Sequence, residues 1–104
     1  MSKVTSMSNM FRLSNYNNSS IGSWNPMSVT NMYQMFSYNQ SFNQPINSWN
    51  VGNVTYMESM FEFATAFNQP LNLWNTSKVT SMRTMFYNAN NFNQNISNWT
   101  VNTV

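Results

Sequence analysis

Residues 54–61 read Val54-Thr55-Tyr56-Met57-Glu58-Ser59-Met60-Phe61, and the spacing of Val, Thr, two Met and Phe in this stretch decides the fold. The same pattern starts again at Val4, Val29 and Val79, always 25 residues apart, and Val104 continues the spacing. A fixed period between about 20 and 50 residues is typical of chains in which one structural unit stacks on copies of itself. The sequence therefore predicts a stack in which each unit contacts its neighbours.

Two other columns of residues keep the same period. They are Trp24, Trp49, Trp74 and Trp99, and Asn43, Asn68 and Asn93. Large apolar side chains at one repeating position are usually buried, so we expect the Trp column to be core and not a platform for sugars. We expect the Asn column to be an inward ladder of amides that pair between repeats. The first repeat diverges, with Asn17-Asn18-Ser19 in place of Phe-Asn-Gln, as is expected of a cap.

The repeat contains two patterns of secondary structure. Residues 45–51 have few helix formers and begin with a proline, so they predict a short strand. Residues 54–63 place Val54, Met57, Met60 and Phe61 on one face of a short helix. One strand and one helix per 25 residues indicate an α/β solenoid, a leucine-rich-repeat-like right-handed coil with a parallel sheet on one face.

We expect one repeat domain over residues 1–104. It contains about four repeats, approximately 1–25, 26–50, 51–75 and 76–100, and residues 101–104 start a further one. The end faces of such a stack expose a cross-section of apolar side chains, which usually marks an interface. Head-to-tail contacts that do not close produce a filament. The chain is therefore expected to be part of a longer array or to assemble end to end with copies of itself.

The composition excludes several classes of partner and site. The net charge of +2 is small and scattered, so we expect no nucleic acid partner. The chain has no Cys and no His, which excludes a disulfide framework, and we expect no metal and no cofactor. It also has no run of about 18 apolar residues, so we expect no transmembrane segment.

Three phrases carry a resemblance to a known family. They are Phe67-Asn68-Gln69-Pro70-Leu71, Trp74-Asn75-Thr76-Ser77-Lys78-Val79-Thr80 and Met82-Arg83-Thr84-Met85-Phe86. They resemble the 25-residue repeat of BspA-like, mycoplasma-type surface proteins, and the resemblance covers essentially the whole chain. It implies a leucine-rich-repeat-like solenoid in secreted, cell-surface or lipoprotein chains. It further implies adhesion or binding, and no enzymatic activity.

Candidate catalytic residues are limited to one pair. Glu58 and Glu62 are four residues apart on the expected helix and would share a face. Paired carboxylates can perform acid–base chemistry, but this pair occurs in one repeat and has no Cys, His or Asp beside it. We therefore expect a protein that is not an enzyme.

The candidate ligand-facing residues are tyrosines that do not share one position of the repeat. They are Tyr16, Tyr38, Tyr56 and Tyr87. Because they fall outside the periodic columns, we expect them to lie outside the core. They would contact the ligand if the chain were an adhesin-type module that recognises a host protein or a glycan.

N-glycosylation is the one modification for which the sequence has acceptor patterns. The stronger candidates vary between repeats and are expected to face outward: Asn39, Asn53, Asn95 and Asn98. The weaker candidates are Asn17, Asn18 and Asn75, of which Asn18 and Asn75 stand in periodic Asn columns and are expected to be buried.

The function that follows from these patterns is structural. We expect a non-enzymatic extracellular or cell-surface repeat protein that stacks end to end into a fibre, which covalent glycans could coat. The alternative is the adhesin-type binding module.

Overall fold

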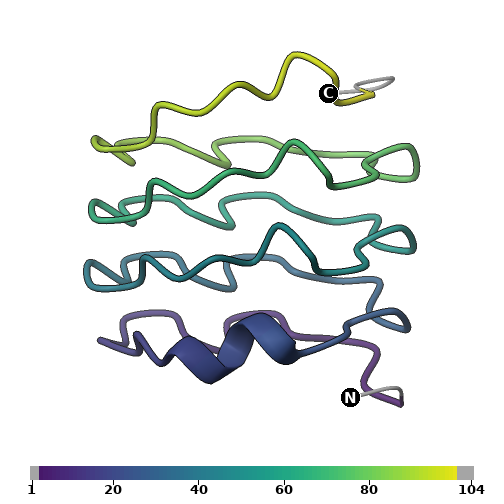
Figure 1. Cartoon of the computed structure of the whole chain (residues 1–104), viewed down its shortest axis with the longest axis horizontal. Coiled ribbons are helices and arrows are strands. Elements are labelled where there is room, and N and C mark those ends of the chain that lie inside the picture. The colour runs from purple at the N-terminus through teal and green to yellow at the C-terminus, as the bar shows by residue number, and fades with distance from the viewer. Residues whose placement is uncertain (1–2, 101–104) are drawn as a thin grey trace.

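A computed structural model describes residues 3–100 of the chain. Each 25-residue repeat makes one flat circuit, here called a rung, and the four rungs (3–25, 26–50, 51–75 and 76–100) lie above one another (Figure 1). The molecule measures 28 × 28 × 20 Å, and the stacking direction lies in the plane of the two longer dimensions. The expected start of a further repeat at 101–104 lies outside the described residues.

Most backbone hydrogen bonds between neighbouring rungs run in one direction, and the exceptions are those that Thr30, Thr55, Tyr56 and Thr80 donate to the preceding rung. In the second rung, the N–H groups of alternate residues donate to carbonyl oxygens of the third rung over 2.7–3.0 Å. The donor–acceptor pairs are Met32–Tyr56, Gln34–Glu58, Phe36–Met60 and Tyr38–Glu62. The equivalent pairs join the first rung to the second and the third to the fourth. Each of these N–H groups therefore points toward the C-terminal end of the stack, and each of these carbonyl groups points toward its N-terminal end.

The predicted α/β solenoid of leucine-rich-repeat type, with its right-handed coil of strands and helices, is wrong. In residues 3–100 the structure has no α-helix and no named strand, so it has no parallel sheet. The only helix among these residues is the 3₁₀-helix η1 (Ser19–Ser23). The predicted helix 54–63 is a run of turns, and it contains the isolated parallel bridges of Tyr56 to Asn31 and Ser81. The predicted strand 45–51 is irregular.

Left-handed backbone conformations explain why neither element forms. Two positions of every rung have φ between 54° and 60°, and none of these residues is glycine. The positions are Asn9, Gln34, Ser59 and Thr84, and Leu13, Tyr38, Phe63 and Asn88. A left-handed residue ends both a right-handed helix and an extended strand. The chain instead makes successive tight turns, such as Met60 N–H to Met57 O and Glu62 N–H to Ser59 O.

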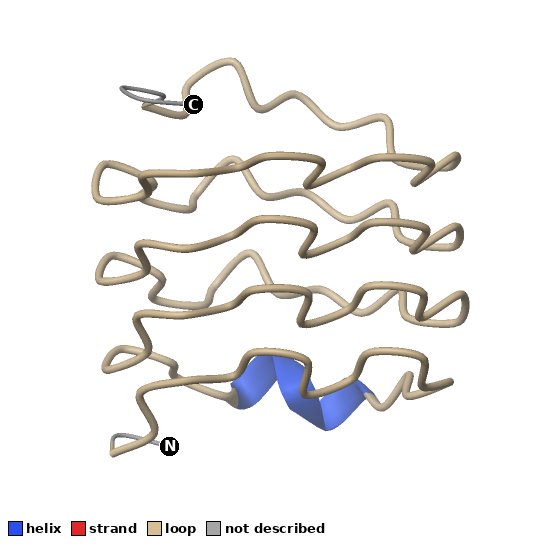
Figure 2. Cartoon of the chain, turned by 180° about the vertical axis from the view of Figure 1, so that it is seen from behind, coloured by secondary structure: helices blue, strands red, loops and turns tan. Residues whose placement is uncertain are grey.

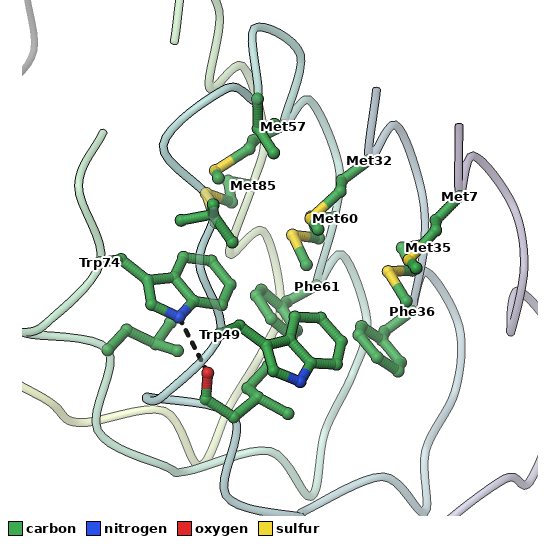
Figure 3. Close-up of a cluster of buried hydrophobic side chains, with 14 of the residues drawn as sticks. Met7, Met32, Met35, Phe36, Trp49, Met57, Met60, Phe61, Trp74 and Met85 are labelled. Atoms are coloured by element: carbon green, nitrogen blue, oxygen red, sulfur yellow. Dashed lines mark hydrogen bonds between the residues drawn. The ribbon is translucent and has the colours of Figure 1, made fainter. Parts of the chain in front are cut away.

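The core consists of columns of identical side chains that run through the stack (Figure 3). Phe36 and Phe61 are fully buried, and their rings stack at 5.5 Å between centroids. Trp49 and Trp74 are buried beside them and stack at 6.4 Å. The fully buried methionines belong to two columns and fill the space between the Phe column and the turns: Met7, Met32 and Met57, and Met35 and Met60. The 25-residue period is thus the period of the core.

The first rung carries the same core with a shift of one residue. Tyr16 stacks on Phe11 at 4.1 Å, as Phe42 stacks on Phe36 at 4.0 Å. Tyr16 therefore occupies the place of Phe42, although it follows its partner after five residues instead of six. The first rung has one additional residue between Tyr16 and Ile21, so Ile21 is again 25 residues before Ile46. Ile21 lies in η1, which forms the far side of the lowest rung in Figure 2.

Leu13 allows a test of the left-handed positions. Its side chain is 67% exposed and its φ is 58°, whereas the equivalent residue in the fourth rung is Asn88. A left-handed conformation costs most L-residues about 1–2 kcal/mol, and asparagine tolerates it best after glycine. We expect Leu13→Asn to raise the free energy of unfolding by about 0.5–1 kcal/mol in urea denaturation. Leu73→Asn is the control, because Leu73 is equally exposed but has no positive φ. Equal stability of both variants would contradict the prediction.

Candidate functional site

The two end faces of the stack carry complementary backbone groups. On the C-terminal face, four N–H groups have no backbone partner among residues 3–100: those of Met82, Thr84, Phe86 and Asn88. On the N-terminal face, four carbonyl oxygens accept no backbone bond from the described residues: those of Ser6, Ser8, Met10 and Arg12. These are the positions that pair between rungs inside the stack. At these positions the C-terminal face offers four donors and the N-terminal face four acceptors, in the same register. The bonds of one other column run the opposite way, since Thr30, Thr55 and Thr80 each donate to the threonine of the preceding rung.

The apolar side chains of the end faces are also only half covered. Phe36 and Phe61 are fully buried, whereas Phe11 and Phe86, their equivalents in the outer rungs, are partly exposed. The C-terminal face contains a cavity of about 310 Å³ with an apolar lining of Met82, Met85, Phe86, Ile96 and Trp99, and with Ser97 at its edge. On the opposite face Met10 is 42% exposed, although its equivalents Met35 and Met60 are fully buried. One face is hollowed and the other presents an uncovered methionine.

The Trp column links the rungs by hydrogen bonds as well as by packing. The indole N–H of Trp49 donates to the Ile21 carbonyl, and that of Trp74 to the Ile46 carbonyl, at 3.0 and 2.9 Å. Trp99 makes the same bond to Leu71. Trp24 is partly exposed because no rung lies beneath it in the described structure. These contacts occupy the tryptophans within the stack.

The Asn ladder exists, but it lies on the surface and not inside. Asn43, Asn68 and Asn93 are exposed, so the expected inward position is wrong. The side-chain oxygen of Asn43 accepts from the Asn68 N–H at 2.9 Å and from the Gln69 amide at 3.1 Å. The lateral surface tolerates these amides because the side-chain oxygens of Asn43 and Asn68 each accept from two donors of the next rung. The ladder starts at Asn17, which receives the same bonds from Asn43 and Gln44.

Residues 1–104 match the family described as "Mycoplasma protein of unknown function, DUF285". The chain belongs to this family. No curated protein and no solved structure matches it. The family description agrees with a mycoplasma-type repeat, and it does not extend to a leucine-rich repeat or to a function.

The four candidate tyrosines do not form one surface. Tyr38, Tyr56 and Tyr87 are exposed, and Tyr38 stacks on Phe63 at 4.7 Å. Tyr16 is partly buried and packs against the core, so the expectation that it lies outside the core is wrong. The reason is the shifted register of the first rung, which gives Tyr16 the place of a core phenylalanine. Tyr33 is 40% exposed and was not among the candidates.

The structure and the sequence analysis differ on which of the glycosylation candidates are exposed. Asn39 is fully buried; its amide donates to the Tyr16 carbonyl and its oxygen accepts from the Ser41 and Phe42 N–H groups. The expectation that Asn39 faces outward is therefore wrong. The other stronger candidates are exposed: Asn53, Asn95 and Asn98. The weaker candidates Asn17, Asn18 and Asn75 are exposed too. The expectation that Asn18 and Asn75 are buried is therefore wrong. Use of any of these acceptors stays a prediction.

The two glutamates do not lie on a helix face. Glu62 accepts a hydrogen bond from the Ser37 hydroxyl at 3.3 Å, whereas Glu58 lines a different part of the surface beside Tyr33 and Arg83. In residues 3–100 no group of three acidic, Cys or His side chains could hold a metal ion. No described helix is long and apolar enough to cross a membrane.

Proposed function

We propose that the chain is a non-enzymatic structural repeat protein of the cell surface or extracellular space that stacks head to tail with copies of itself. The observation that carries this proposal is the complementarity of the end faces, where four backbone donors on one face match four backbone acceptors on the other in the register of the stack. The surface location is supported by the resemblance to BspA-like, mycoplasma-type surface proteins.

The proposed contact continues the register of the stack. The N–H groups of Met82, Thr84, Phe86 and Asn88 would donate to Ser6, Ser8, Met10 and Arg12 of a second copy, as their equivalents do one rung earlier. The Met10 side chain would enter the cavity of about 310 Å³ on the C-terminal face. Each end face measures roughly 28 × 20 Å, which is of the order of the ~800 Å² per partner that standard interfaces bury.

Aligned peptide dipoles favour the same arrangement. Most of the peptide groups that join the rungs point their N–H toward the C-terminal end, and only those of Thr30, Thr55, Tyr56 and Thr80 point the other way. Their dipoles of about 3.5 D therefore leave a net dipole along the stack. The result is a positive C-terminal face and a negative N-terminal face, which attract each other head to tail and repel head to head. Because the contact is heterologous and does not close, it repeats and gives a filament.

The test is the size of the 104-residue chain in solution at increasing concentration, followed by electron microscopy. We expect assemblies that lengthen with concentration, and we expect Ile96→Glu to abolish them by placing a charge in the apolar C-terminal face. Leu73→Glu is the control, since Leu73 is 71% exposed and lines no end face. Monomeric wild-type protein at millimolar concentration, or equal assembly by both variants, would overturn the proposal.

A cross-linking variant keeps the test independent of the folding of Ile96→Glu. Thr80 N–H donates to the carbonyl of Thr55, its equivalent one rung earlier, at 2.9 Å. In the proposed stack Thr80 lies one rung from Thr5 of the next copy, close enough for a disulfide. Because the chain has no cysteine, oxidised Thr5→Cys/Thr80→Cys protein should form covalent multimers. Thr5→Cys/Thr55→Cys protein should not, and equal cross-linking of the two pairs would contradict the predicted register.

A further inference from the structure

A second cavity, of about 390 Å³, shares no residue with the apolar cavity of the C-terminal face. It is lined by Tyr33, Glu58, Ser59, Arg83 and Thr84, which come from three successive rungs. Its volume falls within the roughly 300–1,000 Å³ of small-ligand sites. The lining residues occupy only two positions of the repeat, the eighth and the ninth. Most core positions repeat the same or a similar apolar residue, whereas these two positions differ in every rung, so the stack itself does not require the side chains found there.

The cavity contains a carboxylate with an unused oxygen. Glu58 Oε1 is buried and has no hydrogen-bond partner in the described structure. A buried polar atom without a partner is costly, and native proteins rarely retain one without a reason. A ligand hydroxyl would supply the missing donor.

The hydroxyl groups beside Glu58 have a defined orientation. Thr84 Oγ1 donates its proton to the Arg83 carbonyl at 2.7 Å. Ser59 Oγ lies 2.6 Å from Thr84 Oγ1, so Ser59 must be the donor of that bond. The Ser59 oxygen is thereby left with its lone pairs as acceptor sites. The cavity combines two acceptors, at Glu58 and Ser59, with the guanidinium donors of Arg83.

From this arrangement we propose that the cavity binds a neutral carbohydrate. One carboxylate and one guanidinium balance each other, which favours a ligand without net charge over a metal ion or a phosphate. Sugar hydroxyls both donate and accept, as the mixed lining requires. The ring of Tyr33 is 40% exposed and offers an apolar surface for the C–H face of a sugar ring. The site adjoins the C-terminal end face, because Thr84 also supplies a backbone N–H to the proposed stacking, but its proposed ligand contacts are side chains and not that N–H group.

The probes are methyl glycosides of glucose, galactose, mannose and N-acetylglucosamine, added to the full chain at about 10 mM, a concentration suited to weak binding. We expect saturation transfer to at least one glycoside, with amide shifts confined to Tyr33, Glu58, Ser59, Arg83 and Thr84. No transfer to any of the four would overturn the proposal. Shifts that appear with free alanine instead would assign the cavity to a zwitterion and also overturn it.

Two variants and one control variant distinguish a role in ligand binding from a role in stability. Glu58→Gln and Tyr33→Ala should each weaken glycoside binding about tenfold or more, because each removes a principal contact. Glu62→Gln should leave binding unchanged, since Glu62 lines no part of the cavity. Glu58→Gln removes the charge of a carboxylate whose buried Oε1 has no hydrogen-bond partner in the described structure, so the thermal stability of this variant should not fall. Binding that survives in both variants would overturn the proposal.

Discussion

Replacement of Phe61 by alanine is expected to lower the free energy of unfolding by about 3–5 kcal/mol. Phe61 is fully buried, and its ring stacks on Phe36 at 5.5 Å, Phe67 at 4.2 Å and Phe86 at 5.6 Å. Its loss opens a cavity between three rungs that the rigid turns on either side cannot fill. Domains are typically stable by about 5–15 kcal/mol, so the variant should lose a large share of its stability.

The measurement is urea denaturation followed by tryptophan fluorescence, since Trp74 lies 6.5 Å from the Phe61 ring. Tyr87→Ala is the matched control, because Tyr87 is 54% exposed and should cost less than about 1 kcal/mol. A loss below about 1.5 kcal/mol in Phe61→Ala would show that the aromatic column does not hold the rungs together.

Deletion of Ser59 is expected to prevent folding of the third rung. Bonding to the next rung uses the N–H groups of alternate residues, from Met57 to Phe63. A deletion inside this run exchanges the residues that point to the next rung with those that close turns, as a one-residue slip does in a sheet. It also takes Met60 and Phe61 out of their columns. Each lost backbone hydrogen bond costs about 1 kcal/mol, and each misplaced core side chain costs about 2–5 kcal/mol. Together these losses exceed the free energy of unfolding expected for the third rung.

The control is deletion of Thr65, in the segment between Phe61 and Phe67. The first rung already lacks one residue in the equivalent segment, because only four residues separate Phe11 from Tyr16. Amide hydrogen exchange should show protection of the third rung in the Thr65 deletion and none in the Ser59 deletion. Protection in both proteins would show that the alternation of donors does not fix the rung.

The secondary structure could not be predicted from the apolar spacing alone. Val54, Met57, Met60 and Phe61 have the spacing of a helix face, yet all four are buried by a chain that turns and does not coil. A series of turns with left-handed residues at Ser59 and Phe63 places the same side chains inward. Nothing in those residue types signals a positive φ, since glycine occurs at neither position. Packing and bonds to the next rung impose the conformation.

The sequence also could not predict which asparagines are exposed. Asn43 and Asn39 both lie next to large aromatic residues, and the sequence pattern predicts that the periodic Asn43 is inside and the variable Asn39 outside. The structure shows the opposite, because periodic polar residues pair along the surface, while Asn39 fills an inner corner with three hydrogen bonds. Periodicity reports that a contact repeats between rungs. It does not report on which side of the chain that contact lies.

The sequence by itself determined that residues 25 apart contact each other, because only identical side chains in identical places explain an unbroken period of Val, Met, Phe and Trp. It also determined which apolar columns make the core. The tertiary structure alone decided the path of the chain within a rung, the shifted place of Tyr16 and the cavity at Glu58. It also decided the polarity of the end faces. These features depend on the direction of each peptide group, which is fixed by bonds between rungs and not by the residues that carry them.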